Sequence, residues 1–227
     1  MIKLEKVSKY FGKIQVLKDI NLEIQEGESI AILGANGSGK TTLVEMIAGS
    51  LKPSSGKIIH SDKNINIGIQ FQDGSWPLGT TPKDLIIFYK GNNYEKDNYV
   101  LELLDIFELN LLLKKDLNSL SAGQKQRFNS FLSVVNEPKI LILDELITGL
   151  DLKMQVKLTN FFNKFRTEKK ISLIIVSHIP EEVEILSDRI IILKDGFIFE
   201  DVKMQDMLTK YGSVRKRLVN FFENENK

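Results

Sequence analysis

The chain has 227 residues with 31 basic and 30 acidic side chains, a near balance that gives no support to a nucleic-acid or anionic-membrane surface. It holds no cysteine, so disulfides, thiol catalysis and zinc–thiolate sites are excluded. No uncharged apolar run approaches the ~20 residues of a membrane span, and we expect a soluble, cytoplasmic protein without a signal peptide.

The first predicted elements are antiparallel β-strands. Ile20, Leu22 and Ile24 alternate with polar residues, as in a half-buried strand, and a turn follows at Gly27. Residues 29–33 then form a short apolar run, which is typical of a buried parallel strand.

A glycine-rich loop follows this strand directly. Residues 34–41 fit the pattern G-x-x-x-x-G-K-[ST], in which glycines let several backbone N–H groups gather on the phosphates of a nucleotide. We expect Lys40 to reach the β- and γ-phosphates and the Thr41 hydroxyl to bind Mg²⁺. The predicted nucleotide-binding residues of this loop are Gly34, Asn36, Gly37, Ser38, Gly39, Lys40, Thr41 and Thr42.

The context of the loop supports this interpretation. Leu43, Met46 and Ile47 fall on one face of a helix that should end at Gly49. The order strand, loop, helix aims a helix N-terminus at phosphate, so the segment predicts nucleotide binding.

The middle of the chain is predicted to be helical from about Thr81. Four apolar residues between positions 100 and 107 follow the i, i+3, i+4, i+7 spacing of a helix face. Further on, Ser121 and Gln124 form a predicted capping box at the start of another helix. Such an end presents free N–H groups to an anion, although a capping box needs no ligand.

A second element of phosphate chemistry follows. Residues 140–143 form an apolar strand with Asp144 and Glu145 at its carboxyl end, where open α/β sheets bind ligands. We expect Asp144 to hold Mg²⁺ and Glu145 to polarise the attacking water. Further strands are predicted at residues 171–176, 189–193 and 197–199, the last two forming a hairpin.

Taken in order, these motifs resemble the ATP-binding subunit of ABC transporters. The family signature Leu-Ser-Gly-Gly-Gln is matched at residues 120–124, with Ala122 in place of the first glycine. The resemblance runs from about residue 2 to residue 199. It implies an α/β fold with a P-loop NTPase core, a mostly parallel sheet, an N-terminal antiparallel β subdomain and an inserted α-helical subdomain. The single domain would cover residues 1–227, with its core at about 1–75 and 136–227 and the helical subdomain at about 76–135.

The resemblance also assigns residues that the motifs alone do not. Gln72 is similar to the glutamine of the Q-loop, a contact to metal and water, and His178 is similar to the switch histidine that reaches the γ-phosphate. Phe11, or its neighbour Tyr10, resembles the aromatic residue that stacks on adenine. The implied catalytic residues are Glu145, His178 and Gln72, and the implied metal ligands are Thr41, Gln72 and Asp144.

The family's active site is shared between two subunits. Ser121, Gly123 and Gln124 of one subunit would then close over the ATP and Mg²⁺ of the other, and Asp151 would lie in the D-loop that touches the opposite subunit. The implied partners are a second ATPase subunit, in a homodimer or a heterodimer, and transmembrane permease subunits, with no nucleic acid. The chain would therefore lie on the inner face of the cell membrane.

The resemblance also bears on the type of transporter and on the residues Trp76 and Leu146. Residues 84–91 are similar to the helical lobe of small exporter-type ATPases, so we expect an exporter; the alternatives are an importer subunit or an ABC-type ATPase with soluble partners. Trp76 lies just past Gln72, where the family docks its membrane partner, and is either an interface anchor or ordinary packing. Leu146 stands where the family usually has proline, so that turn lacks a restraint on φ.

Overall fold

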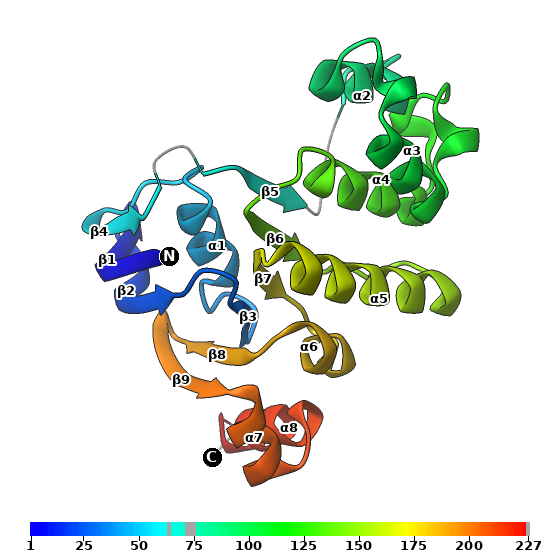
Figure 1. The fold of residues 1–227 in the computed structure, drawn as a ribbon. Coiled ribbons are helices and arrows are strands. Elements are labelled where there is room, and N and C mark those ends of the chain that lie inside the picture. Colours follow the sequence, from blue (N-terminus) through cyan, green and yellow to red (C-terminus); the bar gives the residue numbers. More distant parts are fainter. Residues whose placement is uncertain (63–64, 71–75, 226–227) are drawn as a thin grey trace.

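The computed structural model describes residues 1–62, 65–70 and 76–225. Within them the strands form one sheet of three strands and one sheet of six, and a group of helices is inserted between two strands of the larger sheet (Figure 1). This arrangement confirms the predicted α/β fold, with its antiparallel β subdomain and mostly parallel sheet.

The small sheet is antiparallel and has the order β2-β1-β4. Its strands are β1 (Ile2–Phe11), β2 (Ile14–Ile24) and β4 (Ser55–His60). The predicted alternation is observed, because Ile20, Leu22 and Ile24 are buried while the residues between them are exposed. One face of this sheet therefore packs on the core, as period-two patterning requires.

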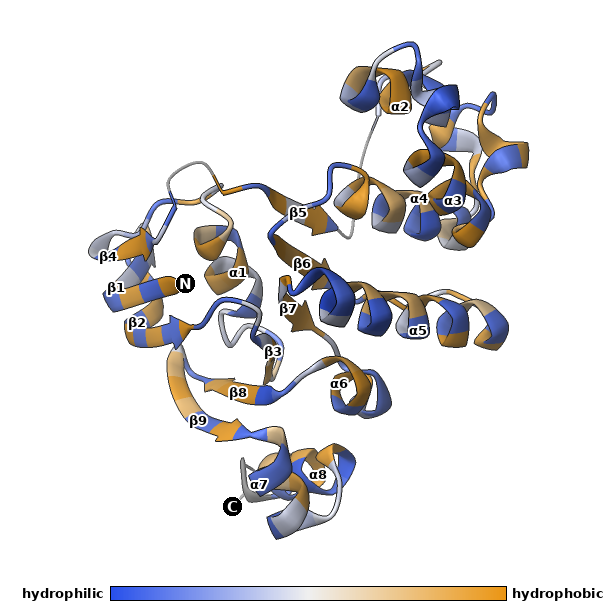
Figure 2. Cartoon of the chain, viewed as in Figure 1, coloured by the Kyte–Doolittle hydropathy of each residue, from blue (hydrophilic) through white to orange (hydrophobic). Residues whose placement is uncertain are grey.

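The large sheet has the order β5-β6-β7-β3-β8-β9. Its strands are β3 (Ser29–Gly34), β5 (Ile67–Gln70), β6 (Ile140–Asp144), β7 (Ser172–Val176), β8 (Arg189–Lys194) and β9 (Phe197–Lys203). All neighbours are parallel except β9, which pairs antiparallel with β8 through the predicted hairpin. Figure 2 shows β6 and β7 hydrophobic along their length, as expected for strands that are covered on both faces.

The two faces of this sheet belong to two hydrophobic clusters. On one face Ile30, Ile142 and Ile174 pack with α1 (Lys40–Ile47) and the small sheet. On the other face Ala31, Leu141 and their neighbours pack with helices of the rest of the chain. Those helices are α5 (Leu152–Lys169), α6 (Pro180–Leu186), α7 (Met204–Tyr211) and α8 (Val214–Glu225), together with the inserted ones.

The inserted helices are α2 (Pro82–Lys90), α3 (Asn98–Ile106) and α4 (Ala122–Val134), with the short 3₁₀ turns Tyr94–Lys96, Asn110–Leu112 and Leu117–Ser119. Their starts are capped by side chains: Thr81 and Ser121 make capping boxes, and Asp97 accepts from two backbone N–H groups. In Figure 1 α2 and α3 lie far from the small sheet. We keep residues 76–135 as the proposed extent of the helical subdomain.

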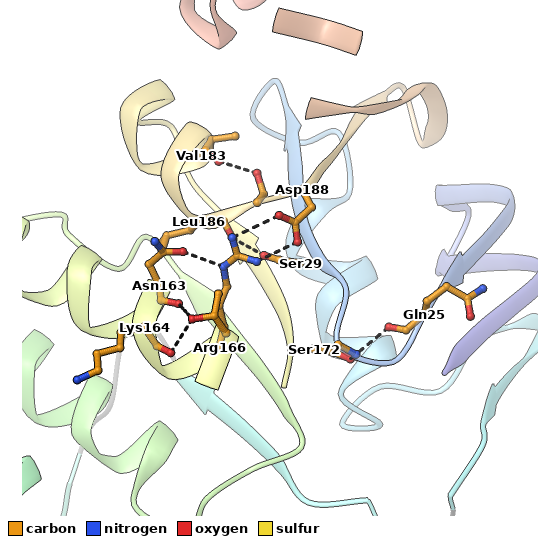
Figure 3. A network of polar contacts seen from close by, with 12 residues as sticks. Gln25, Ser29, Asn163, Lys164, Arg166, Ser172, Val183, Leu186 and Asp188 are labelled. Atoms are coloured by element: carbon orange, nitrogen blue, oxygen red, sulfur yellow. Dashed lines mark hydrogen bonds and ion pairs between the residues drawn. The ribbon is translucent and has the colours of Figure 1, made fainter. Parts of the chain in front are cut away.

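A polar network joins the helices on one side of the sheet to its strands (Figure 3). The Arg166 guanidinium of α5 donates to both carboxylate oxygens of Asp188, at 2.9 and 3.3 Å, and to Asn163. The Ser29 hydroxyl of β3 donates to the carbonyl of Leu186 at the end of α6. These contacts fix α6, which follows the predicted switch histidine, against the strand that carries the glycine-rich loop. Among the described residues, no helix is both long and apolar enough to span a bilayer.

Candidate nucleotide-binding site

The glycine-rich loop connects β3 to α1 and needs glycine at two positions. Gly34 has φ +144° and Gly39 has φ +102°, conformations that residues with a Cβ rarely adopt. A Cβ on Gly34 would collide with the carbonyl of Leu193, and one on Gly39 would lie 2.6 Å from a methyl of Leu17. The loop is thereby pressed against β8 and β2, and its backbone N–H groups precede the N-terminus of α1.

Lys40 is buried at the start of α1. Its ammonium donates to the carbonyl oxygens of Gly34 and Ala35, each at 3.0 Å. Burial lowers the pKa of Lys40, while the charges of Asp144 and Glu145 act in the opposite direction. A desolvated ammonium held by two neutral carbonyls would gain from a bound anion, because charge-assisted hydrogen bonds are stronger than those to neutral acceptors.

The residues of this region fit a nucleotide phosphate. The side-chain oxygen of Ser38 is buried and, within the part of the chain that the structure describes, has no hydrogen-bond partner. A buried hydroxyl without a partner is uncommon and needs an explanation. A phosphate oxygen in the loop would supply the missing acceptor.

The loop opens into a cavity of about 350 Å³ at the carboxyl ends of β3, β6 and β7. This is the edge of a parallel sheet where ligands bind. The cavity brings together most of the predicted phosphate and metal groups. It is lined by Val16, Asn36, Gly37, Gly39, Lys40, Thr41, Thr42, Asp144, Glu145, Val176 and His178.

Asp144 ends β6 and Glu145 follows it, and both residues line this cavity. The pKa of Asp144 is raised to about 6, first by burial and then by the neighbouring charge of Glu145, while Lys40 acts in the opposite direction. Two adjacent carboxylates that repel one another are stabilised by a cation between them and the phosphates. Asp144 and the hydroxyl of Thr41, which lines the same cavity, are oxygen donors of the kind that Mg²⁺ prefers.

The backbone at Glu145 is held in an uncommon conformation. Its φ is +52°, and its N–H donates to the carbonyl of Val176 at 2.8 Å. The carboxylate oxygen Oε1 lies 3.8 Å from Nε2 of His178, and both side chains are accessible to solvent. The predicted water-polarising group and the predicted switch histidine therefore lie side by side in the lining of the cavity.

A buried carboxyl group lies behind His178. The Ser177 hydroxyl donates to Oε2 of Glu182 and accepts from the N–H of Ile179 at 3.0 Å, so it ties the loop to the start of α6. Glu182 is 2% exposed, and burial raises its pKa to about 7, which the bond from Ser177 opposes. No local pattern marks this group, because a glutamate in the first turn of a helix is ordinarily exposed.

We expect Glu182→Gln to stabilise the protein at pH 8 by about 2 kcal/mol more than at pH 5. The raised pKa means that the native state holds a proton that the unfolded chain has released, so stability falls as pH rises from about 4.5 to about 7. Glutamine removes this penalty and keeps an acceptor for Ser177. Urea unfolding at the two pH values measures the difference; an equal effect at both would contradict it. The neighbouring Glu181, exposed and paired with Arg215, is the control position.

Other predicted residues do not line the cavity. Phe11 and Tyr10 lie at the end of β1 with 48% and 45% of their surface exposed, and the structure does not choose between them. Lys9 lies over the Phe11 ring at 5.2 Å. Val16 of β2 does line the cavity, and sequence analysis missed it because one apolar residue in a strand carries no signal. Gln72 lies outside the described residues.

The signature and the D-loop also lie outside the lining of this cavity. Ser121 and Gln124 form the predicted capping box at the start of α4, and Ser121 is exposed. A Cβ on Gly123 would lie 3.0 Å from the carbonyl of Gly149, so α4 starts against the D-loop of the same chain. The carboxylate of Asp151 caps α5 by accepting from the N–H of Met154 at 2.9 Å.

Known proteins are similar to the chain over most of its length. The family model described as ABC transporter matches residues 17–148. The nickel import system ATP-binding protein NikE of Staphylococcus aureus is 35% identical over 215 residues, 91% of this chain and 92% of the relative. Strains of the same species supply several such relatives at 34–35% identity.

Solved structures agree with these sequence matches. The ATP-binding cassette MJ0796, a bacterial ABC transporter cassette seen as a dimer bound to ADP and Pi, is 30% identical with a TM-score of 0.80. The match covers 90% of this chain and 99% of that one. The protein cbiO1 of Clostridium perfringens, part of the ABC transporter complex cbiONQ, is 31% identical with a TM-score of 0.75 over 92% of this chain and 90% of that one.

These similarities correct one expectation. The similarity of residues 84–91 to exporter-type ATPases has no support here, because the relatives at 34–35% identity are named as parts of a nickel import system. In the structure α2 covers most of that segment with a short amphipathic helix. An amphipathic pattern of this kind serves the packing of a helix and carries no information on the direction of transport.

Proposed function

The chain belongs to the ABC transporter family of ATP-binding proteins, and from this premise we propose that it is the ATP-hydrolysing subunit of an importer. The observation that carries the catalytic part is the single cavity in which Lys40, Glu145 and His178 meet. The importer type is supported by the names of the relatives at 34–35% identity. The subunit would lie at the inner face of the membrane, held there by its partners.

ATP is the substrate in this proposal. Its phosphates would bind the N–H groups of the glycine-rich loop, the Lys40 ammonium and the unpartnered Ser38 hydroxyl. Mg²⁺ would neutralise charge on the phosphates when bound. Thr41 and Asp144 would hold it, and we propose the same role for Gln72. Phe11 would stack on the adenine, with Tyr10 as the alternative.

The hydrolytic step needs a base and a group at the γ-phosphate. Glu145 would accept a hydrogen bond from the attacking water and take its proton as the water oxygen bonds to the γ-phosphorus. The bond from that phosphorus to the β–γ bridging oxygen breaks, and ADP and inorganic phosphate leave. His178 would contact the γ-phosphate, because its ring lines the cavity beside Glu145, with Nε2 3.8 Å from the carboxylate. The loop that carries His178 is anchored by Ser177 to Glu182, which limits how far the ring can move.

A second subunit would complete the site. Ser121, Gly123 and Gln124 begin a helix whose end is exposed and does not line the cavity of its own chain. We propose that this end covers the ATP of a partner subunit, and that Asp151 lies in the D-loop at the same interface. The dimer seen for MJ0796 with ADP and Pi supports pairing of two such subunits. The proposal holds whether the two subunits are identical or different.

The enzymatic part is tested by phosphate release from ATP by the purified chain. We propose that phosphate release requires Mg²⁺ and stops when EDTA is added. Without the cation, the carboxylates of Asp144 and Glu145 would repel the negatively charged phosphates. Release that continues at full rate in EDTA would contradict the metal assignment. The importer type is tested by uptake of radioactive nickel in cells that lack the chain. An importer predicts less accumulated nickel than in wild-type cells, and more would contradict import.

Permease subunits are the proposed membrane partners, and Trp76 is the proposed contact. A cavity of about 320 Å³ lies between β5 and α4, with Trp76 and Tyr89 on its walls. The carbonyl of Trp76 accepts from Asn118 at 3.1 Å, so the segment is fixed to the helical subdomain. A half-buried tryptophan at the rim of an open groove is the kind of residue that anchors interfaces.

We expect Trp76→Ala to weaken association with the permease about tenfold or more, since anchor residues contribute about 2 kcal/mol. Phosphate release by the isolated subunit should remain, because Trp76 does not line the nucleotide cavity. Leu111→Ala is the control, because Leu111 is 91% exposed elsewhere on the helical subdomain. Co-purification measures the effect, and equal recovery of wild type and Trp76→Ala would contradict the anchor.

A further inference from the structure

The turn that follows β6 is held by a residue that no motif marked. Gln126 lies in the second turn of α4, and its amide Nε2 donates to the carbonyl of Glu145 at 2.7 Å and to that of Leu146 at 2.9 Å. Two consecutive carbonyls are therefore held by one side chain from another element. Glutamine can do this because its amide carries two donors on one nitrogen.

These contacts fix both peptide groups that flank Glu145. On one side its N–H donates to the carbonyl of Val176, and on the other its carbonyl accepts from Gln126 and, at 3.3 Å, from Thr148. The direction of a Cα–Cβ bond is set by the two peptide planes around it. Gln126 thus helps to set where the Glu145 carboxylate points into the cavity.

The local backbone makes such support necessary. Glu145 has φ +52°, a left-handed conformation that is uncommon for a residue with a Cβ and costs free energy unless contacts support it. Leu146, which follows, has no ring to restrain its φ, although its side chain is buried in the core at 1% exposure. Leu146 also packs in the core with Phe128 and Phe131 of α4, so the inserted helix touches this turn through both apolar contacts and the Gln126 hydrogen bonds.

We propose that Gln126 is a positioning residue for ATP hydrolysis, which holds the Glu145–Leu146 turn so that the Glu145 carboxylate meets the attacking water. This rests on the proposed role of Glu145. Because Gln126 and Ser121 lie on the same helix, a displacement of α4 would also reach this turn. The amide donates to backbone only, so its effect on the reaction passes through Glu145.

The test is the rate of hydrolysis per nucleotide-binding site in Gln126→Leu, which keeps the bulk of the side chain and removes its donors. We expect kcat to fall about tenfold to 100-fold, as small misplacements of catalytic groups do. The affinity for ATP should stay within about threefold, because Gln126 does not line the cavity. Counting sites by bound nucleotide removes any contribution from unfolded protein, and Gln126→Ala serves if Gln126→Leu does not fold.

Gln155 provides a matched control. Its Nε2, from α5, donates to the carbonyls of Ile147 and Leu150, at 3.3 and 2.9 Å. It therefore holds the part of the same segment that follows the Glu145–Leu146 turn. Gln155→Leu is expected to keep kcat per site within about twofold. An equal loss in both variants, or an unchanged kcat in Gln126→Leu, would overturn the proposal.

The double variant separates this proposal from the one it rests on. If Gln126 acts through Glu145, then Gln126→Leu should not lower the residual rate of Glu145→Gln any further. A full additional loss there would overturn the positioning role. Failure of the Glu145 assignment has a different signature, because Glu145→Gln alone would then hydrolyse ATP at a near-normal rate.

Discussion

Glu145→Gln is expected to lower the ATP turnover of this chain by about 100-fold to 10,000-fold, the range that a lost general base commonly costs. The amide keeps the shape of the side chain but cannot take a proton from water. ATP affinity should stay within about threefold, because the loop and Lys40 remain intact. The variant should therefore accumulate as a dimer closed on ATP, visible by light scattering in the presence of ATP and Mg²⁺.

Glu137→Gln is the matched control for this prediction. Glu137 also has a left-handed backbone, with φ +48°, but it lies on the surface and pairs with Lys169 at 3.2 Å. Its replacement should leave turnover unchanged, since exposed ion pairs contribute little. Near-normal turnover in Glu145→Gln would reject Glu145 as the group that orients the water.

Lys40→Ala is expected to weaken ATP binding about 100-fold or more, because it removes charge-assisted hydrogen bonds to two phosphates. The carbonyls of Gly34 and Ala35, which the ammonium holds at 3.0 Å, would also lose their donor, so the loop should be less ordered. Calorimetric titration with ATP measures the affinity directly.

Lys157→Ala controls for the loss of a lysine that holds backbone. Its Nζ donates to the carbonyl of Asp105 at 3.4 Å and pairs with Glu108 at 3.0 Å. Lys157 lies in α5, and both of its partners lie in the helical subdomain. That variant should bind ATP as the wild type does. Undiminished affinity in Lys40→Ala would contradict the assignment of residues 34–41 as the phosphate cradle.

The parts of the fold and site that could be predicted from sequence are those with local rules. The glycine-rich loop carries its own signal, because Gly34 and Gly39 adopt backbone conformations that exclude other residues. Asp144 and Glu145 follow an apolar strand, and the carboxyl ends of parallel strands share one edge of the sheet. The sequence therefore predicts that these groups lie at one edge of the sheet, where the cavity is found.

The remainder depends on contacts between distant elements. Val16 reaches the cavity because β2 passes beside the loop, and Gln126 reaches Glu145 because α4 packs over the end of β6. Neither an isolated valine nor a glutamine within a helix differs in sequence from ordinary packing or a solvated face. The burial of Glu182 has the same origin, since only the packing of α6 removes it from water.

The expected direction of transport had no physical basis in the chain. Residues 84–91 form most of α2, in which Phe88 is 79% exposed. A single exposed aromatic residue is ordinary on a protein surface. It does not indicate the direction in which a transporter moves its cargo.

The most direct measurement of the central claim is affinity purification of the tagged chain from detergent-solubilised native membranes, with its partners identified by mass spectrometry. The account predicts a polytopic membrane protein that is recovered with the wild type and depleted with Trp76→Ala. Recovery of soluble proteins alone, with phosphate release intact, would contradict the transport role and favour an ABC-type ATPase with soluble partners.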